Sequence, residues 1–181
     1  MDLEQDQLLA KARQCLQLEM EAIGLTADSL GPAFVDVIGR IRKTMLAGNK
    51  LIFTGVGKNV PICQKLMGTF NSTGVPTAHL DPNQALHGDL GFCTGGDLAF
   101  LFSNSGETED LIRIIPFLKR LGVQTLAITA NLDSTLARHC DTALSYAYAQ
   151  EACPLNIAPT ASTTATMALG GALAMVYLDR K

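Results

Sequence analysis

The chain has 181 residues, of which 48% are hydrophobic and 17% are charged, and its net charge is −3. A chain of this size and composition buries a substantial core within one domain, which excludes an intrinsically disordered protein. It carries no block of Lys or Arg, so neither nucleic acid nor an anionic membrane is an expected partner.

Two helical patterns open the chain. Apolar residues recur at helical spacing from Leu8 to Ile23 and again from Phe34 to Met45. Gly48 follows the second pattern, as a left-handed helix cap would. We expect residues 1–29 to form a helical segment ahead of a domain that covers residues 30–181, and this segment either covers the sheet or mediates contacts between subunits.

Strands and helices alternate from residue 51 onward. Nearly continuous apolar runs predict strands at 51–53, 76–80, 98–102, 124–129 and 142–146. One helical pattern follows the glycine turn that ends at Lys58 and runs to about residue 72. Others cover 107–121, 134–139 and 160–177. The alternation predicts an α/β fold, in which helices cover both faces of a parallel sheet. The stretch 159–178 has no charge, but its many small residues favour a buried helix over a membrane span.

The segment Ser103–Thr108 predicts an anion site. It follows an apolar strand and precedes a helix, where free backbone N–H groups and the helix dipole favour negative charge. Ser103, Ser105 and Thr108 add hydroxyl donors, and Gly106 lets the backbone approach a ligand closely. A phosphorylated small molecule is the expected ligand.

The glycine turn Gly55–Lys58 fits neither common nucleotide motif. A P-loop needs a glycine where Ile52 stands and a hydroxyl residue where Asn59 stands. A dinucleotide fingerprint needs a third glycine where Val60 stands. The turn therefore predicts that Lys58 faces a ligand at the edge of the sheet, with an exposed, solvated lysine as the alternative.

The remaining polar residues give weaker signals. His87 lies in a loop, and its pKa near neutrality suits proton transfer, although a lone loop histidine is usually solvated. The hydroxyl-rich start of the last predicted helix, 160–166, indicates a polar cavity, whereas Glu151 is by default a solvated loop carboxylate. The five cysteines lack C-x-x-C spacing, which favours reduced thiols in the cytoplasm. We expect no metal and no cofactor.

Four motifs together resemble the sugar isomerase (SIS) domain family, and within it the D-arabinose 5-phosphate isomerases. They are SNSGET at 103–108, GVGK at 55–58, HGDLG at 87–91 and EACPLNIAPTASTTATMALG at 151–170. The resemblance covers roughly residues 30–180. It implies a flavodoxin-like, three-layer α/β/α sandwich with a five-stranded parallel sheet, in a cytoplasmic homotetramer with sites between subunits. It also implies the single-domain form, without CBS domains.

The resemblance further implies the residues of the site. Those expected to be catalytic are Lys58, His87, Asp110 and Glu151. Those expected to bind substrate are Gly57, Gly74, Val75, Asp81, Ser103, Asn104, Ser105, Thr108, Ser162 and Thr163. Asp110 stands where relatives carry a glutamate, Asp81 stands where they often carry a histidine, and the sequence stops before the family's His-Pro-Gly-Gly segment.

Family enzymes interconvert D-ribulose 5-phosphate and D-arabinose 5-phosphate, which supplies the Kdo of lipopolysaccharide or capsule. The reaction passes through a cis-enediol, so Lys58 would stabilise the oxyanion while Glu151, Asp110 or His87 moves protons. Burial would decide which of these pKa values rises toward neutrality. Two alternatives are a non-catalytic phosphosugar sensor and an isomerase of another sugar phosphate, such as a hexulose or heptulose phosphate.

Overall fold

The computed structural model describes residues 3–181, so residues 1 and 2 of the predicted N-terminal segment lie outside it. Five parallel strands form one sheet in the order β2-β1-β3-β4-β5. The strands are β1 (Leu51–Gly55), β2 (Thr77–His79), β3 (Leu98–Phe102), β4 (Gln124–Thr129) and β5 (Thr142–Ser145). The helices are α1 (Leu3–Asp28), α2 (Pro32–Leu46), α3 (Asn59–Ser72), α4 (Pro82–Ala85), η1 (Asp89–Phe92), α5 (Glu109–Arg120), α6 (Thr135–His139) and α7 (Ala161–Asp179). The predicted α/β class with a five-stranded parallel sheet is confirmed.

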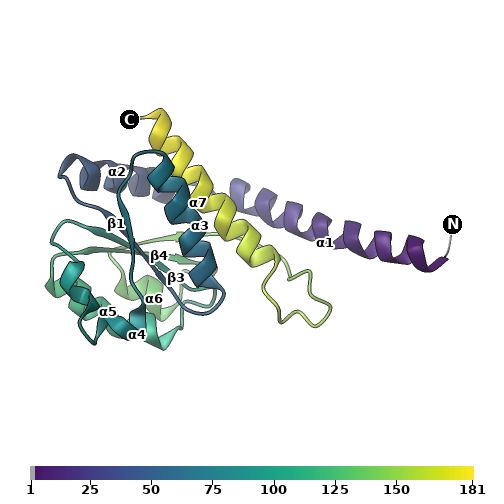
Figure 1. Ribbon diagram of the computed structural model, residues 1–181. Helices are drawn as coiled ribbons and strands as arrows, with labels where there is room; N and C mark the ends of the chain where they lie inside the picture. Colours follow the sequence, from purple (N-terminus) through teal and green to yellow (C-terminus); the bar gives the residue numbers. More distant parts are fainter. Residues whose placement is uncertain (1–2) are drawn as a thin grey trace.

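Helices cover both faces of the sheet (Figure 1), and the sheet separates two hydrophobic cores. Successive side chains of a strand point to opposite faces, so each covered strand feeds both cores. In β3, Phe100 packs with α2, α3 and α7, whereas Leu101 packs with α4, α5 and α6. Phe100 also stacks on Phe53 of β1, with ring centroids 5.0 Å apart. Because both faces are covered, β1 and β3 are buried along their whole length.

The uncharged helix α7 belongs to the core, as predicted. It has the length and apolar composition of a membrane-spanning helix, but half of its apolar window is buried inside the molecule. Leu169 and Leu173 are at most 2% exposed and lie in the core with α3. Gly170 permits this close packing, because a Cβ there would lie 2.5 Å from methyl carbons of Leu66.

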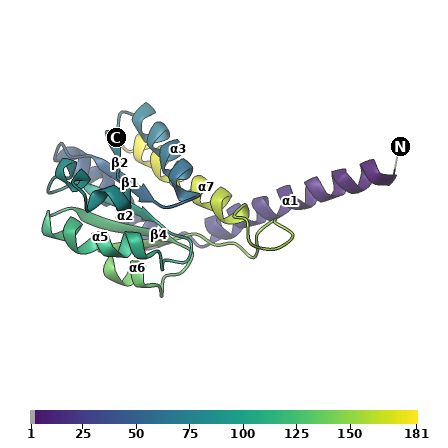
Figure 2. The same cartoon turned by 60° about the horizontal axis from the view of Figure 1, so that its bottom comes forward.

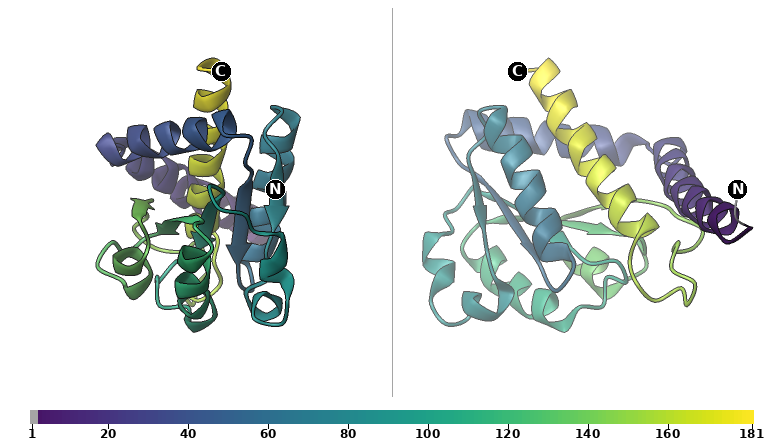
Figure 3. Two further views of the ribbon diagram at one scale, coloured as in Figure 1. Left: turned by 90° about the vertical axis from the view of Figure 1, so that its left-hand side faces the viewer. Right: turned by 45° about the vertical axis from the view of Figure 1, so that its right-hand side comes forward.

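Helix α1 projects away from the sheet (Figures 2 and 3). Its C-terminal end is anchored by Thr26, whose hydroxyl donates to the carbonyl oxygen of Ala147 at 3.0 Å. Toward its N-terminus, Leu8, Leu16 and Met20 are each 61–66% exposed. The single chain therefore leaves much of the apolar surface of α1 uncovered.

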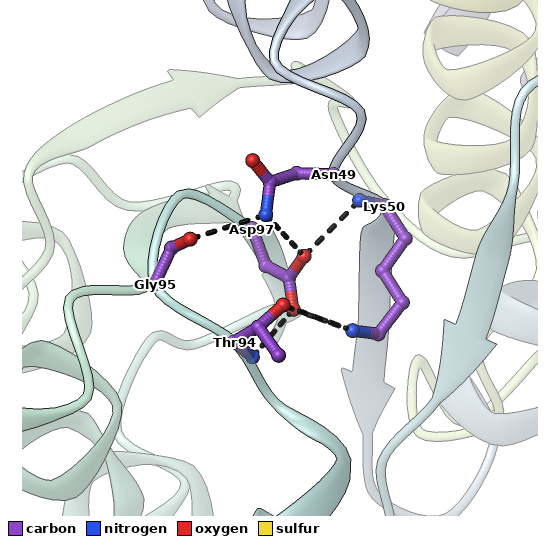
Figure 4. Close-up of polar contacts among 5 residues, drawn as sticks. All are labelled: Asn49, Lys50, Thr94, Gly95 and Asp97. Atoms are coloured by element: carbon purple, nitrogen blue, oxygen red, sulfur yellow. Dashed lines mark hydrogen bonds and ion pairs between the residues drawn. The ribbon is translucent and has the colours of Figure 1, made fainter.

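A buried carboxylate ties together the edge at which β1 and β3 begin (Figure 4). Asp97 is fully buried, and it accepts hydrogen bonds from Lys50 Nζ at 2.7 Å and from the backbone N–H of Thr94 at 2.8 Å. Asn49 donates to both Asp97 and the carbonyl oxygen of Gly95. Burial raises the pKa of Asp97, but the bonds from Lys50 and Thr94 outweigh it and lower that pKa. Asp97 thus joins the residues that precede β1 to those that precede β3.

Candidate functional site

The turns that follow the strands meet at the opposite, carboxyl edge of the sheet. β1 lies next to β3, with Gly55 paired to Phe102, and the strand order reverses between them. Ligands bind at this position in open α/β sheets. Asn59 Nδ2 donates to the carbonyl oxygen of Phe102 at 3.2 Å. The turn that carries Lys58 is therefore fixed beside the start of the Ser103–Thr108 turn.

Ser103 and Thr108 have different roles in that turn. Ser103 is 2% exposed, and its Oγ accepts the backbone N–H of Gly106 at 3.0 Å. The same oxygen lies 2.7 Å from Thr108 Oγ1. When Ser103 donates to Thr108, the proton of the half-buried Thr108 hydroxyl stays available to a ligand. Ser103 therefore supports the turn from inside, and Thr108 presents the more exposed of the two hydroxyl groups.

The backbone adds further donors. Thr108 occupies the N-cap of α5 but makes no capping bond with its side chain. Within residues 3–181, the N–H groups of Ser105, Thr108, Glu109 and Asp110 have no acceptor. Free N–H groups at a helix start form an anion-binding site, since they combine with the positive end of the helix dipole.

Contacts with the neighbouring β4–α6 loop hold the turn in shape. Gly106 has a φ of +70°, and a Cβ there would collide with the side chain of Ser134. Glu107 accepts the backbone N–H of Thr135 at 2.8 Å. Hydrogen bonds from the backbone and side chain of Thr135 lower the pKa of the Glu107 carboxyl. Sequence reasoning missed Glu107 as a positioning residue, although it lies within the SNSGET motif.

Lys58 is exposed at the start of α3. It makes no hydrogen bond or ion pair within the described residues 3–181. Gly57 before it has a φ of +61°, and a Cβ on Gly55 would lie 2.7 Å from the Cβ of Asn59. The two glycines thus allow the tight turn that leaves the ammonium group open to a ligand.

His87 and Asp110 come together in a cavity of about 200 Å³ between α4 and α5. Arg113, one turn after Asp110 on α5, lines the same cavity and was missed by sequence reasoning. Asp81 lies nearby and caps α4, because it accepts the N–H of Asn83 at 2.8 Å. Within residues 3–181, no three His, Cys, Asp or Glu side chains gather as metal ligands do.

Glu151 is buried rather than solvated, with 8% of its surface exposed. Its Oε2 accepts the N–H and the hydroxyl of Thr160 at 2.7 and 3.0 Å, and the N–H of Ser162 at 3.2 Å. Burial raises the pKa of Glu151, but the bonds from Ser162 and Thr160 outweigh it and lower that pKa. Glu151 is therefore ionised at neutral pH and fixes the start of α7.

The hydroxyl groups at the start of α7 mostly bind the chain itself, contrary to the polar cavity expected from their density. Thr163 donates to the carbonyl oxygen of Thr160 at 2.8 Å, and Thr166 donates to that of Ser162 at 2.8 Å. Ser162 is 2% exposed. In the single chain, the predicted substrate-binding residues Ser162 and Thr163 lie in this network rather than on an open surface.

Gly74 and Val75 lie away from the other predicted residues. They precede β2, whose first residue pairs with Leu51 at the beginning of β1. Parallel strands begin at the same edge, so these two residues lie at the edge opposite Ser103–Thr108. Val75 is also buried, with 1% exposed. One chain alone therefore does not bring Gly74 and Val75 to the carboxyl edge. The sequence did not predict this, because a short motif does not encode which edge of the sheet a turn occupies.

Comparisons with known proteins agree with this architecture. The SIS domain family matches residues 45–176. A Haemophilus influenzae protein named "Probable arabinose 5-phosphate isomerase" is 42% identical over 94% of this chain and 50% of its own length. The chain thus spans about half the length of the curated relatives it matches.

Solved structures extend the similarity over nearly the whole chain. The Escherichia coli CFT073 protein c3406, solved in complex with arabinose 5-phosphate, is 32% identical with a TM-score of 0.91 and covers 99% of this chain and 93% of its own. A Bacteroides fragilis protein described as "putative phosphosugar isomerase involved in capsule formation" is 32% identical with a TM-score of 0.90, covering 96% of this chain and 91% of its own.

Proposed function

This chain belongs to the SIS domain family, and from that premise we propose that it is an aldose–ketose isomerase. Its proposed reaction interconverts D-ribulose 5-phosphate and D-arabinose 5-phosphate. The observation that carries the proposal is the set of free N–H groups at the Ser103–Thr108 turn, next to the turn that carries Lys58, whose ammonium group has no ion-pair partner within residues 3–181. The relatives named arabinose 5-phosphate isomerase and the neighbour solved with arabinose 5-phosphate support this substrate.

The proposed mechanism uses the two ends of the substrate differently. The phosphate lies on the N–H groups of Ser105 and Glu109 and on the Thr108 hydroxyl, which fixes the orientation of the sugar. Isomerisation then moves a proton between C1 and C2 and another between O1 and O2. Lys58 stabilises the oxyanion that develops in the cis-enediol, because a fixed cation is most effective where charge develops.

His87 and Asp110 are the better candidates for proton transfer within one chain. Both line one cavity, and within residues 3–181 neither side chain makes an ion pair. Three donors keep Glu151 ionised and tie it to α7, so in the single chain it acts as a support for the site. Arg113 in the same cavity would offset the negative charges of Glu109 and Asp110 when a dianion binds.

The test is proton NMR of the protein with ribulose 5-phosphate in D2O. We expect the C1 proton to exchange with solvent and arabinose 5-phosphate to appear. Lys58→Ala should lower the exchange rate at least about 100-fold, as loss of an oxyanion-stabilising group does. Lys65→Ala is the matched control, because Lys65 lies on α3, which Lys58 caps, and within residues 3–181 its ammonium group bonds only to the hydroxyl of Thr69. Binding without any exchange in the wild type would instead indicate a phosphosugar sensor.

We further propose a homotetramer with sites between subunits, in the cytoplasm. Three apolar side chains on α1 support assembly, since burying them in an interface is favourable: Leu8, Leu16 and Met20. All five cysteines are free, which fits a reducing compartment. Light scattering should give a mass of four chains, and a monomeric mass would contradict the assembly.

A further inference from the structure

The side chain of Asn104 is held between two tyrosines that follow β5. Tyr146 is 3% exposed, and its hydroxyl donates to Asn104 Oδ1 at 2.9 Å. Burial raises the pKa of Tyr146 to about 12, so the hydroxyl keeps its proton at neutral pH. The backbone carbonyl oxygen of Asn104 is also fixed, because it accepts the hydroxyl of Thr129 and the N–H of Ala130, each at 3.1 Å.

The nitrogen of the Asn104 amide binds the second tyrosine, Tyr148. Asn104 Nδ2 donates to the hydroxyl oxygen of Tyr148 at 2.9 Å. Tyr148 therefore acts as an acceptor toward Asn104, and its own O–H has no acceptor within residues 3–181. The ring stacks on Tyr146, with centroids 6.4 Å apart, and is only half-buried. A donor chain thus runs from buried Tyr146 through Asn104 and ends at the outer hydroxyl of Tyr148.

The free hydroxyl lies at the same edge as the anion site. Tyr148 lines a cavity of about 420 Å³ formed by the turns after β4 and β5. Its partner Asn104 belongs to the Ser103–Thr108 turn, so the Tyr148 oxygen is one hydrogen bond away from that turn. Hydrogen bonds in a chain polarise one another, which strengthens the outermost donor.

We propose that Tyr148 donates its hydroxyl proton to a phosphate oxygen of the bound sugar phosphate, and that Asn104 and Tyr146 are positioning residues for it. The inference rests on the proposed function. It also gives Asn104 a positioning role: its amide oxygen accepts from Tyr146 and its amide nitrogen donates to Tyr148, so it holds the Tyr148 hydroxyl in place.

The test compares three Tyr→Phe variants of the full chain, each of which removes one hydroxyl. Tyr148→Phe should raise KM for ribulose 5-phosphate about tenfold and leave kcat within about twofold, as loss of one hydrogen bond to a charged group does. Tyr146→Phe should raise KM about threefold, and the double variant should resemble Tyr148→Phe alone. Tyr177→Phe is the control, because Tyr177 lies on α7 at the opposite edge of the sheet.

Dissociation constants for inorganic phosphate and unfolding midpoints are measured for the same four variants. Weaker phosphate binding by Tyr148→Phe at an unchanged midpoint would support the inference. An unchanged KM in Tyr148→Phe, or effects of Tyr146→Phe and Tyr148→Phe that multiply in the double variant, would overturn it while the proposed function stands. A wild type that neither binds nor turns over the sugar phosphate would overturn both.

Discussion

Replacing Gly106 by alanine should test how the anion site is held in shape. A φ of +70° costs an L-residue about 1–2 kcal/mol. The new Cβ would also displace Ser134, whose Oγ caps α6 by accepting the N–H of Ala137 at 3.3 Å. Loss of such a cap costs about 1 kcal/mol. Overpacking adds about 1 kcal/mol or more. We therefore expect the free energy of unfolding to fall by about 3–5 kcal/mol.

Gly48→Ala is the matched control for this prediction. Gly48 has a φ of +76°, and nothing lies within 4 Å of a Cβ built there. It should lose only the backbone contribution, about 1–2 kcal/mol. Urea unfolding of the wild type and both variants measures the difference. Ribulose 5-phosphate should stabilise Gly48→Ala but not Gly106→Ala. Equal losses at the two positions would refute the argument that the collision with Ser134 matters.

Three further predictions concern the fold and the assembly. Asp97→Asn should cost about 3–5 kcal/mol at pH 7, because it leaves Lys50 without its buried partner. The folded pKa of Asp97 is lowered, so the stabilisation by Asp97 is present above the unfolded pKa of about 3.9 and is lost as pH falls through the folded pKa. The free energies of unfolding of the wild type and of Asp97→Asn, measured with urea, should therefore converge in acid. A difference that stays constant with pH would contradict this. Gly170→Ala should lower the melting temperature by overpacking Leu66, and a shorter side chain at Leu66 should recover part of that loss. Leu16→Glu on α1 should leave the circular dichroism of the fold intact but reduce the mass seen by light scattering, and an unchanged mass would exclude α1 from the interface.

The sequence predicted the central strands well because they are covered on both faces. β3 and β4 occupy the predicted residues 98–102 and 124–129. Such strands are continuous apolar runs, which end where the backbone leaves the core. The helix after β3 begins at Glu109 rather than at the predicted Glu107. Its first turn is delayed because residues 105–108 form a loop, in which the N–H groups of Gly106 and Glu107 bond to the hydroxyl oxygens of Ser103 and Ser105 instead of entering a helix.

The site was predictable only where contiguous residues create it. The Lys58 turn and the Ser103–Thr108 turn each depend on neighbours in sequence, so short motifs reveal them. The contact between Asn104 and Tyr146 joins residues 42 positions apart, and no spacing rule encodes it. No spacing rule encodes the three hydrogen bonds that Glu151 accepts, nor the edge of the sheet on which Gly74 lies.

The polarity of the Ser103–Thr108 turn limits which phosphate mimics can inhibit the protein. Within residues 3–181, the N–H groups of Ser105, Thr108, Glu109 and Asp110 have no acceptor. A phosphonate presents acceptor oxygens to all of them and should compete with the natural phosphate. A sulfonamide has two acceptor oxygens instead of three, and its N–H group cannot serve as the third acceptor. The design of inhibitors for this turn should therefore begin with groups that only accept hydrogen bonds.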